Sequence, residues 1–174
     1  MIIRPYKGIT PSIHSSAWIA ENAVIIGDVE IGPEVNIWYN VVIRGDLNKI
    51  RIGTQTNIQD GAILHVEAEE GPCLVGERVT IGHQAIVHGC VLEDDALIGM
   101  GATVLSWARI DSGALVAGGA LVKEYEHIPA RTLWAGVPAR QRGVIDDDML
   151  ARMRAGCEHY LELAENYRIQ DATL

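Results

Sequence analysis

An unbroken six-residue period is the feature of this sequence that most limits its fold. Small or branched residues also recur with this period, four positions after each of the first five isoleucines of the first run. A period of six matches neither the turn of an α-helix nor the simple alternation of a strand. It predicts short strands joined by corners, with one inward-facing side chain per strand. The first run consists of Ile13, Ile19, Ile25, Ile31, Ile37 and Ile43.

The period resumes after interruptions, so the repeat extends over most of the chain. It returns from position 52 to 64, from 75 to 87 and from 92 to 122. Three repeats make one turn of a three-sided prism, and turns stack at the strand spacing of about 4.8 Å. We therefore predict an all-β solenoid, a parallel β-helix of about six turns over residues 1–142, with short insertion loops near 47–50 and 66–74. The alternative, a β-sandwich, does not hold a strict period.

The C-terminal segment, residues 143–174, has a helical pattern. We expect Asp146 to cap the start of the helix, and its apolar stripe to pack on the prism of the same or a neighbouring chain. A helix on a membrane surface is the rival interpretation, but the acidic face of Glu158, Glu162 and Glu165 disfavours it. The stripe consists of Leu150, Met153, Cys157, Tyr160, Leu161, Ala164 and Tyr167.

Charge and composition exclude several classes of function. The net charge of −9 would be repelled by nucleic acid and by an anionic membrane, so we expect neither as a partner. The chain contains no apolar run of membrane-spanning length and begins without the pattern of a signal peptide. Three cysteines without a CxxC pair fit reduced thiols, which predicts a cytoplasmic protein.

Three of the six histidines can be placed with the repeat. His65 and His88 each follow a repeat residue, and they occupy the same slot one turn apart if the 66–74 loop is an excursion. Side chains stacked at about 4.8 Å can share a metal ion. His83 falls on a neighbouring face, so we expect it to reach an ion held by an adjacent subunit in a cyclic assembly of three. Three histidines leave a position open for water, as in catalytic zinc sites; the alternative is three unrelated polar residues near a corner.

Over residues 9–142 the chain resembles the γ-class carbonic anhydrase-like family of hexapeptide-repeat proteins. The resemblance implies a left-handed β-helix and a homotrimer with zinc, or else iron or cobalt, at each interface. It also implies that His65, His83 and His88 are the metal ligands. The matching segments are 41–46 (VVIRGD), 57–61 (NIQDG), 79–83 (VTIGH), 88–90 (HGC), 97–102 (LIGMGA) and 135–140 (AGVPAR), together with His65.

Five further polar residues match the family pattern. Arg44 and Asp46 point the same way from one strand and resemble the family's charged network with Asp60 across the interface. Their alternative role is a solvated surface pair. Gln59 resembles the residue that hydrogen-bonds metal-bound water or hydroxide, with Asn57 assisting. The alternative for these two is an Asn/Gln ladder that stabilises stacked turns.

The function implied by the resemblance is the reversible hydration of CO2 to bicarbonate by a metal-bound hydroxide. The sequence departs from the family pattern directly after Asp46, where Leu47 stands in place of a proton-transferring Glu. Glu67, Glu69 and Glu70 of the acidic loop are candidates to replace it. Two alternatives stay open: acyl-CoA thioesterase or acyltransferase activity on the same scaffold, and a non-catalytic metal-bound assembly protein.

Overall fold

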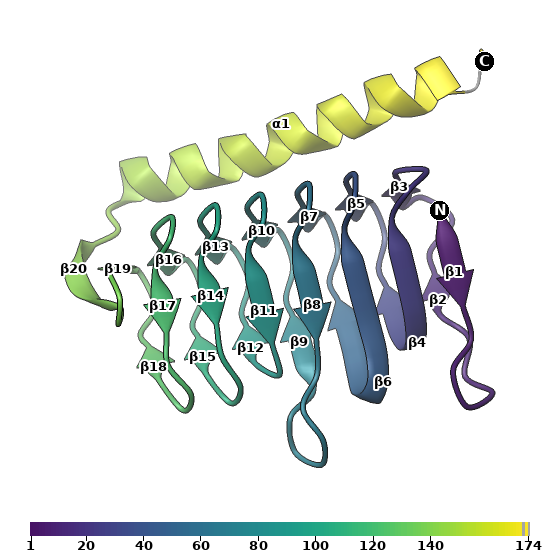
Figure 1. Ribbon diagram of the computed structural model, residues 1–174. Coiled ribbons are helices and arrows are strands. Elements are labelled where there is room, and N and C mark those ends of the chain that lie inside the picture. Colours follow the sequence, from purple (N-terminus) through teal and green to yellow (C-terminus); the bar gives the residue numbers. More distant parts are fainter. Residues whose placement is uncertain (172, 174) are drawn as a thin grey trace.

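The computed structural model describes residues 1–171 and 173, and it confirms the predicted β-helix. Short parallel strands stack into a left-handed, three-sided prism, and one long helix runs along it (Figure 1). Positions 172 and 174 of the predicted helical segment lie outside the described residues.

One face of the prism is an eight-stranded sheet. Its first seven members are parallel, so the described residues form about seven turns rather than the six expected. The eighth strand pairs antiparallel and closes the C-terminal end. The strands are β3 (Trp18–Ile19), β5 (Asn36–Ile37), β7 (Asn57–Ile58), β10 (Thr80–Ile81), β13 (Leu97–Ile98), β16 (Leu115–Val116), β19 (Thr132–Ala135) and β20 (Arg140–Val144).

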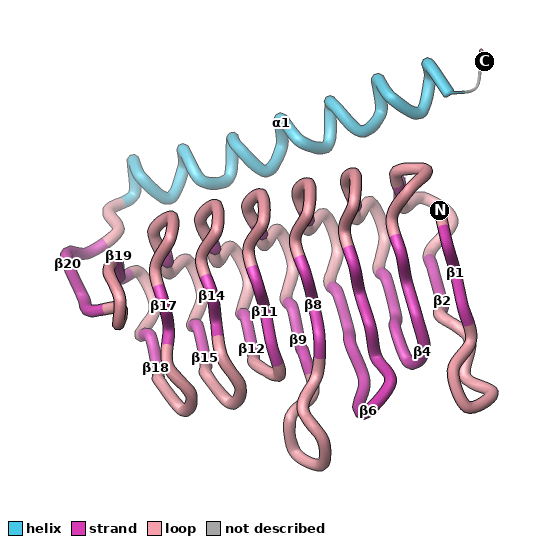
Figure 2. Tube along the Cα trace, in the orientation of Figure 1, coloured by secondary structure: helices cyan, strands magenta, loops and turns pink. Residues whose placement is uncertain are grey.

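A twelve-stranded sheet supplies the other two faces, because its long strands β4 and β6 continue from one face onto the next (Figure 2). Its strands are β1 (Ile2–Arg4), β2 (Ser12–Ile13), β4 (Val24–Ile31), β6 (Val42–Ile52), β8 (Ile63–His65), β9 (Cys73–Val75), β11 (Ile86–His88), β12 (Val91–Leu92), β14 (Thr103–Val104), β15 (Arg109–Ile110), β17 (Leu121–Val122) and β18 (His127–Ile128).

The repeat residues form columns of stacked side chains inside the prism. Along one column each residue pairs with its counterpart one turn away, and every member is fully buried. Burying such a side chain contributes roughly 1.5–3 kcal/mol as an upper estimate. Branched aliphatic side chains fill the narrow interior, so the chain needs no Phe. The column is Ile25, Ile43, Leu64, Val87, Val104 and Val122.

The two interruptions of the repeat differ in structure. Residues 47–50 lie within β6, where the five steps from Gly45 to Ile50 match two steps from Gly27 to Val29 on β4. The pairing of β6 with β4 stops at Gly45 and resumes at Ile50, so the extra residues form a bulge within β6 rather than a separate loop. The expected loop at 66–74 does leave the prism, between β8 and β9 (Figure 1), but it is shorter than expected. Val66 is buried in the core, and Cys73 begins β9, so the excursion spans 67–72. The division between 142 and 143 stays a prediction, and β20 runs across it to Val144.

Helix α1 (Asp147–Asp171) packs on the prism of its own chain. As expected, Asp146 caps it, because its carboxylate accepts a hydrogen bond from the backbone N–H of Met149 at 2.8 Å. Met153 and Cys157 of the stripe are buried. Among the described residues, no helix is both long and apolar enough to cross a membrane.

A cluster of aromatic rings joins the end of α1 to the first turns of the prism. Tyr167 lies 5.5 Å from Trp18 and 5.4 Å from Trp38, and Tyr160 lies 5.3 Å from Trp38, measured between ring centroids. The angled packing of these rings is the arrangement that aromatic pairs favour. The cluster fixes α1 over β3 and β5.

A buried carboxylate ties the start of α1 to a corner of the prism. Asp95 accepts hydrogen bonds from Arg78 Nε at 2.8 Å and from Arg154 of α1 at 2.7 Å. Burial raises the pKa of Asp95, but the bonds from Arg154 and Arg78 outweigh it, so its pKa lies below the ordinary value.

Asp95→Asn should therefore destabilise the fold, by about 1–2 kcal/mol at neutral pH. Because the folded pKa is lowered, the contribution of Asp95 is present above its unfolded pKa of about 3.9 and is lost as pH falls through the folded pKa. Chemical denaturation of both proteins from pH 7 to pH 2.5 measures this difference. A difference that is unchanged at the acid end would show that the ion pair is not its cause.

Candidate metal centre

Two histidines meet on one face of the prism. His65 ends β8 and His88 ends β11, and the two residues pair in register, as the six-residue frame predicted. His65 Nδ1 and His88 Nε2 face each other at 3.0 Å. Arg44 lies one turn below His65 in the same column.

The outer nitrogen of each ring is held by a second side chain. His65 Nε2 lies 2.9 Å from Asp46 Oδ1, and His88 Nδ1 lies 2.9 Å from Ser106 Oγ. Arg44 forms an ion pair with the other oxygen of Asp46. Burial raises the pKa of Asp46, but the hydrogen bonds from His65 and Arg44 outweigh it and hold that pKa below its ordinary value. Both rings are thereby oriented with one nitrogen toward the same point.

The electrostatics favour a neutral ring at His88. Burial lowers the pKa of His88, and the neighbouring His65 lowers it further, while the carboxylate of Glu67 acts in the opposite direction. A neutral imidazole is the form that binds metal ions. The influence of Glu67 also places the start of the 67–72 loop near this pair of rings.

His83 lies elsewhere in the same chain. It follows β10, and its Nδ1 lies 2.9 Å from Asp60 while its Nε2 lies 3.2 Å from the hydroxyl of Tyr160. If Nδ1–H donates to the carboxylate, Nε2 accepts the hydrogen bond of the phenol. Within the residues that the structure describes, no three side chains of the His, Cys, Asp and Glu types gather where one ion would fit.

The amides of β7 and of the corner after it connect to His83 rather than to the His65–His88 pair. Gln59 Oε1 accepts a hydrogen bond from the backbone N–H of His83 at 3.2 Å, and Gln59 Nε2 donates to Asn57 Oδ1 at 3.0 Å. Asn57 also pairs in register with Asn36 one turn earlier. The amide of Asn57 donates to Thr80 Oγ1 in the following turn at 2.8 Å, but it does not bond the amide of Asn36. An amide ladder and a role toward water at the metal both stay predictions.

Asp60 has partners within its own chain. Besides His83, it accepts a hydrogen bond from the backbone N–H of Tyr39 at 3.3 Å. Contact between Asp60 and the Arg44–Asp46 pair across an interface stays a prediction.

Two residues of this region were not among those expected from the sequence. Ser106 lies 18 residues after His88, which is one turn of the prism, so the repeat could have pointed to it. The helical pattern places Tyr160 on the apolar stripe, and no pattern in the sequence predicts that its hydroxyl reaches His83. Burial, with a smaller contribution from Asp60, raises the pKa of Tyr160.

Comparison with known proteins yields several close relatives. The family model described as bacterial transferase hexapeptide (six repeats) matches residues 10–45. A carbonic anhydrase of Geobacillus kaustophilus is 42% identical over 96% of this chain and 91% of its own length. The solved structure of a putative acetyltransferase from Bacillus cereus is 40% identical, with a TM-score of 0.94 over 97% of this chain and 98% of that one.

A longer relative comes from a plant. The mitochondrial gamma carbonic anhydrase 2 of Arabidopsis thaliana is 40% identical over 90% of this chain. The match covers 58% of that protein, and 61% of its paralogue gamma carbonic anhydrase 1, so this chain spans about three fifths of these plant relatives.

Proposed function

The chain belongs to the γ-class carbonic anhydrase-like family of hexapeptide-repeat proteins, and from this membership we propose that it is a metalloenzyme for the reversible hydration of CO2 to bicarbonate. One observation carries the proposal. His65 Nδ1 and His88 Nε2 face each other at 3.0 Å, while Asp46 and Ser106 hold the outer nitrogens. Histidine ligands of metal ions have this arrangement, with the second nitrogen held by an oxygen.

The donor set fits zinc. A zinc–nitrogen bond is about 2.0–2.1 Å long, so two nitrogens 3.0 Å apart can bind the same ion. His65 and His88 of one chain and His83 of a neighbouring chain would hold it, and iron or cobalt would accept the same ligands. A zinc ion with three histidine ligands supplies a water whose pKa is lowered to about 7.

The proposal includes a homotrimer. The face that carries the histidine pair also carries an in-register row of branched apolar side chains, including Val42, Ile63 and Ile86. Ile63 is 41% exposed and Ile86 is 37% exposed. Such a row beside a half-complete site is a surface that a second copy can cover. A cyclic trimer would repeat the contact three times and bring His83 of each copy to its neighbour.

Other residues of the chain would orient the ligands, orient the reacting water and transfer the proton. Asp46 and Ser106 keep the imidazoles in the required tautomer and orientation. Gln59, with Asn57, would orient the reacting water toward CO2. Leu47 is 55% exposed and cannot take a proton, so we assign proton transfer to Glu67, whose carboxylate influences His88.

Two alternatives are tested by the same experiments. Acyl-CoA thioesterase or acyltransferase activity is suggested by the name of the Bacillus cereus relative, a putative acetyltransferase. The second alternative is a metal-bound assembly protein without catalysis.

We also propose a cytoplasmic location, because the three cysteines are free and buried.

Stopped-flow measurement of CO2 hydration tests the main proposal. The zinc- or iron-loaded protein should hydrate CO2, and His88→Ala should lower that rate at least about 100-fold because a ligand is lost. His127→Ala is the matched control, since His127 is exposed and pairs with Asp111. Loaded protein no faster than His88→Ala would refute the anhydrase, and thioester hydrolysis in a parallel assay with acetyl-CoA would favour the alternative.

Mixed trimers test the shared site. Neither His83→Ala nor His65→Ala trimers should hold zinc, although both should keep the prism folded. In trimers that mix the two variants equally, about one quarter of the interfaces should join an intact pair to an intact His83 and recover zinc. Zinc analysis after verified mixing measures this fraction, and no recovery would count against ligands from two subunits.

Ser106→Ala tests the positioning of His88. Loss of its hydroxyl frees His88 Nδ1, so zinc affinity should fall about 10- to 100-fold while the trimer persists. Competition with a chelating dye measures the affinity. Ser15→Ala, an exposed site on another corner, should leave it unchanged. Equal affinity in both variants would show that Ser106 does not position the ligand.

A further inference from the structure

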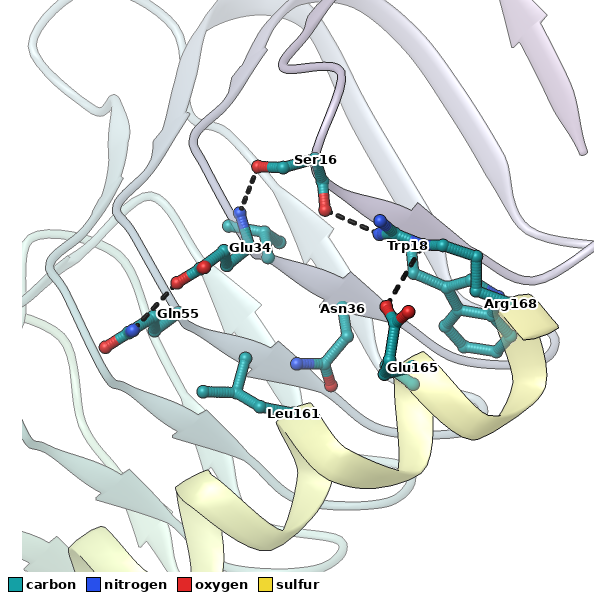
Figure 3. A pocket seen from close by; sticks show the side chains of 10 residues that line it. Ser16, Trp18, Glu34, Asn36, Gln55, Leu161, Glu165 and Arg168 are labelled. Carbon is teal, nitrogen blue, oxygen red and sulfur yellow. Dashed lines mark hydrogen bonds and ion pairs between the residues drawn. The ribbon is translucent and has the colours of Figure 1, made fainter.

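A cavity of about 340 Å³ lies between the last turns of α1 and the first corners of the prism (Figure 3). This volume is within the range of small-molecule sites. The cavity adjoins the eight-stranded sheet, whereas His65 and His88 belong to the twelve-stranded one. Trp18 and Leu161 contribute apolar surface, and Glu34, Gln55 and Arg168 contribute polar groups.

The side chain of Asn36 gives this cavity an unused hydrogen-bond donor. Asn36 is 1% exposed, and its Oδ1 accepts a hydrogen bond from Trp38 Nε1 at 2.8 Å. The indole N–H can only donate, so the orientation of the amide is fixed. Its Nδ2 has no partner among the described residues. Figure 3 shows this amide projecting from the strand toward Leu161 and the cavity.

The next turn of the prism shows how such a donor is normally satisfied. Asn57 is the in-register counterpart of Asn36, and its Nδ2 donates to Thr80 Oγ1 at 2.8 Å and approaches Cys157 Sγ of α1 at 3.5 Å. Beside Asn36 the helix presents Leu161 and Ala164, which have no side-chain acceptor. A buried donor without an acceptor is rare in folded proteins.

The charges around the cavity indicate which kind of ligand could accept the hydrogen bond of Asn36 Nδ2. Arg168, the cation among the described lining residues, already donates to the carbonyl oxygen of Ser16 at 2.6 Å and lies 3.7 Å from Glu165. Glu34 accepts a hydrogen bond from Gln55 at 2.8 Å and keeps capacity for another. Two carboxylates and one engaged cation disfavour an anion. They favour a neutral carbonyl group that also carries N–H donors.

We propose that this cavity binds a small uncharged carboxamide. Its carbonyl oxygen accepts the hydrogen bond of Asn36 Nδ2, and its N–H group donates to the carboxylate of Glu34. Its apolar body lies against Trp18 and Leu161. The site would couple the position of α1 to a ligand in solution, because α1 forms one wall of the cavity.

Calorimetric titration with benzamide and benzoate tests the proposal on the full chain. The two probes have the same shape but differ in charge and in N–H donors. Benzamide should bind with a Kd of about 1 mM or tighter, which is typical of a small fragment, and benzoate should bind at least about tenfold more weakly. Equal binding of the two probes, or no binding of benzamide, would overturn the assignment.

Two variants locate the binding. Ala164→Leu extends a side chain into the cavity from the helix side and should abolish benzamide binding. Because Ala164 is buried beside Trp18, this substitution should also lower the melting temperature while a single cooperative transition remains. Ala151→Leu, on the exposed side of α1, should leave benzamide binding unchanged. Asn36→Leu removes the donor and should weaken binding at least about tenfold. Unchanged affinity in Ala164→Leu contradicts the site. So does a crystal structure with benzamide that shows only water beside Asn36 Nδ2.

Discussion

Backbone hydrogen bonds between successive turns are the constraint on which the rest of this structure depends. They hold each strand in exact register with the strand one turn away, so Arg44, His65 and His88 stand in one column. The strand spacing of about 4.8 Å is what brings two imidazoles to hydrogen-bond distance. A slip of one residue would turn both rings into the core, because successive side chains alternate between inside and outside.

The sequence predicts the structural features that depend on the six-residue period. It predicts the prism, the buried columns, the pairing of His65 with His88 and the separate direction of His83, because each follows from counting in steps of six. It does not predict the structure where the period is interrupted, or how α1 lies on the prism. The extra residues at 47–50 read as a loop, yet they form a bulge within β6, whose pairing with β4 stops at Gly45 and resumes at Ile50. The contact of Tyr160 with His83 depends on how α1 lies on the prism, which no local pattern encodes.

The six-residue period does not determine the residues at the corners of the prism, and several of these residues contact α1 or line the cavity. Several corner residues other than glycine adopt the left-handed backbone conformation, among them Glu34, Gln55 and Asp95. Each such residue costs about 1–2 kcal/mol relative to the usual conformation. The stacking of corner on corner offsets this cost, since the backbone N–H of Gln55 and that of Asp95 each bond to the preceding turn. The same three side chains line the cavity beside Asn36 or tether α1.

The path of α1 has a consequence for cooperativity. A solenoid whose turns contact only their neighbours is a one-dimensional array, and such an array can fray from either end. Here α1 begins beside the last turn, where Arg131 pairs with Asp147, and ends against the first turns, where Tyr167 meets Trp18 (Figure 1). The helix therefore acts as a strap between the two ends of the array. The first turn cannot detach without breaking contacts that also hold the C-terminal segment, so distant turns are expected to unfold as one unit.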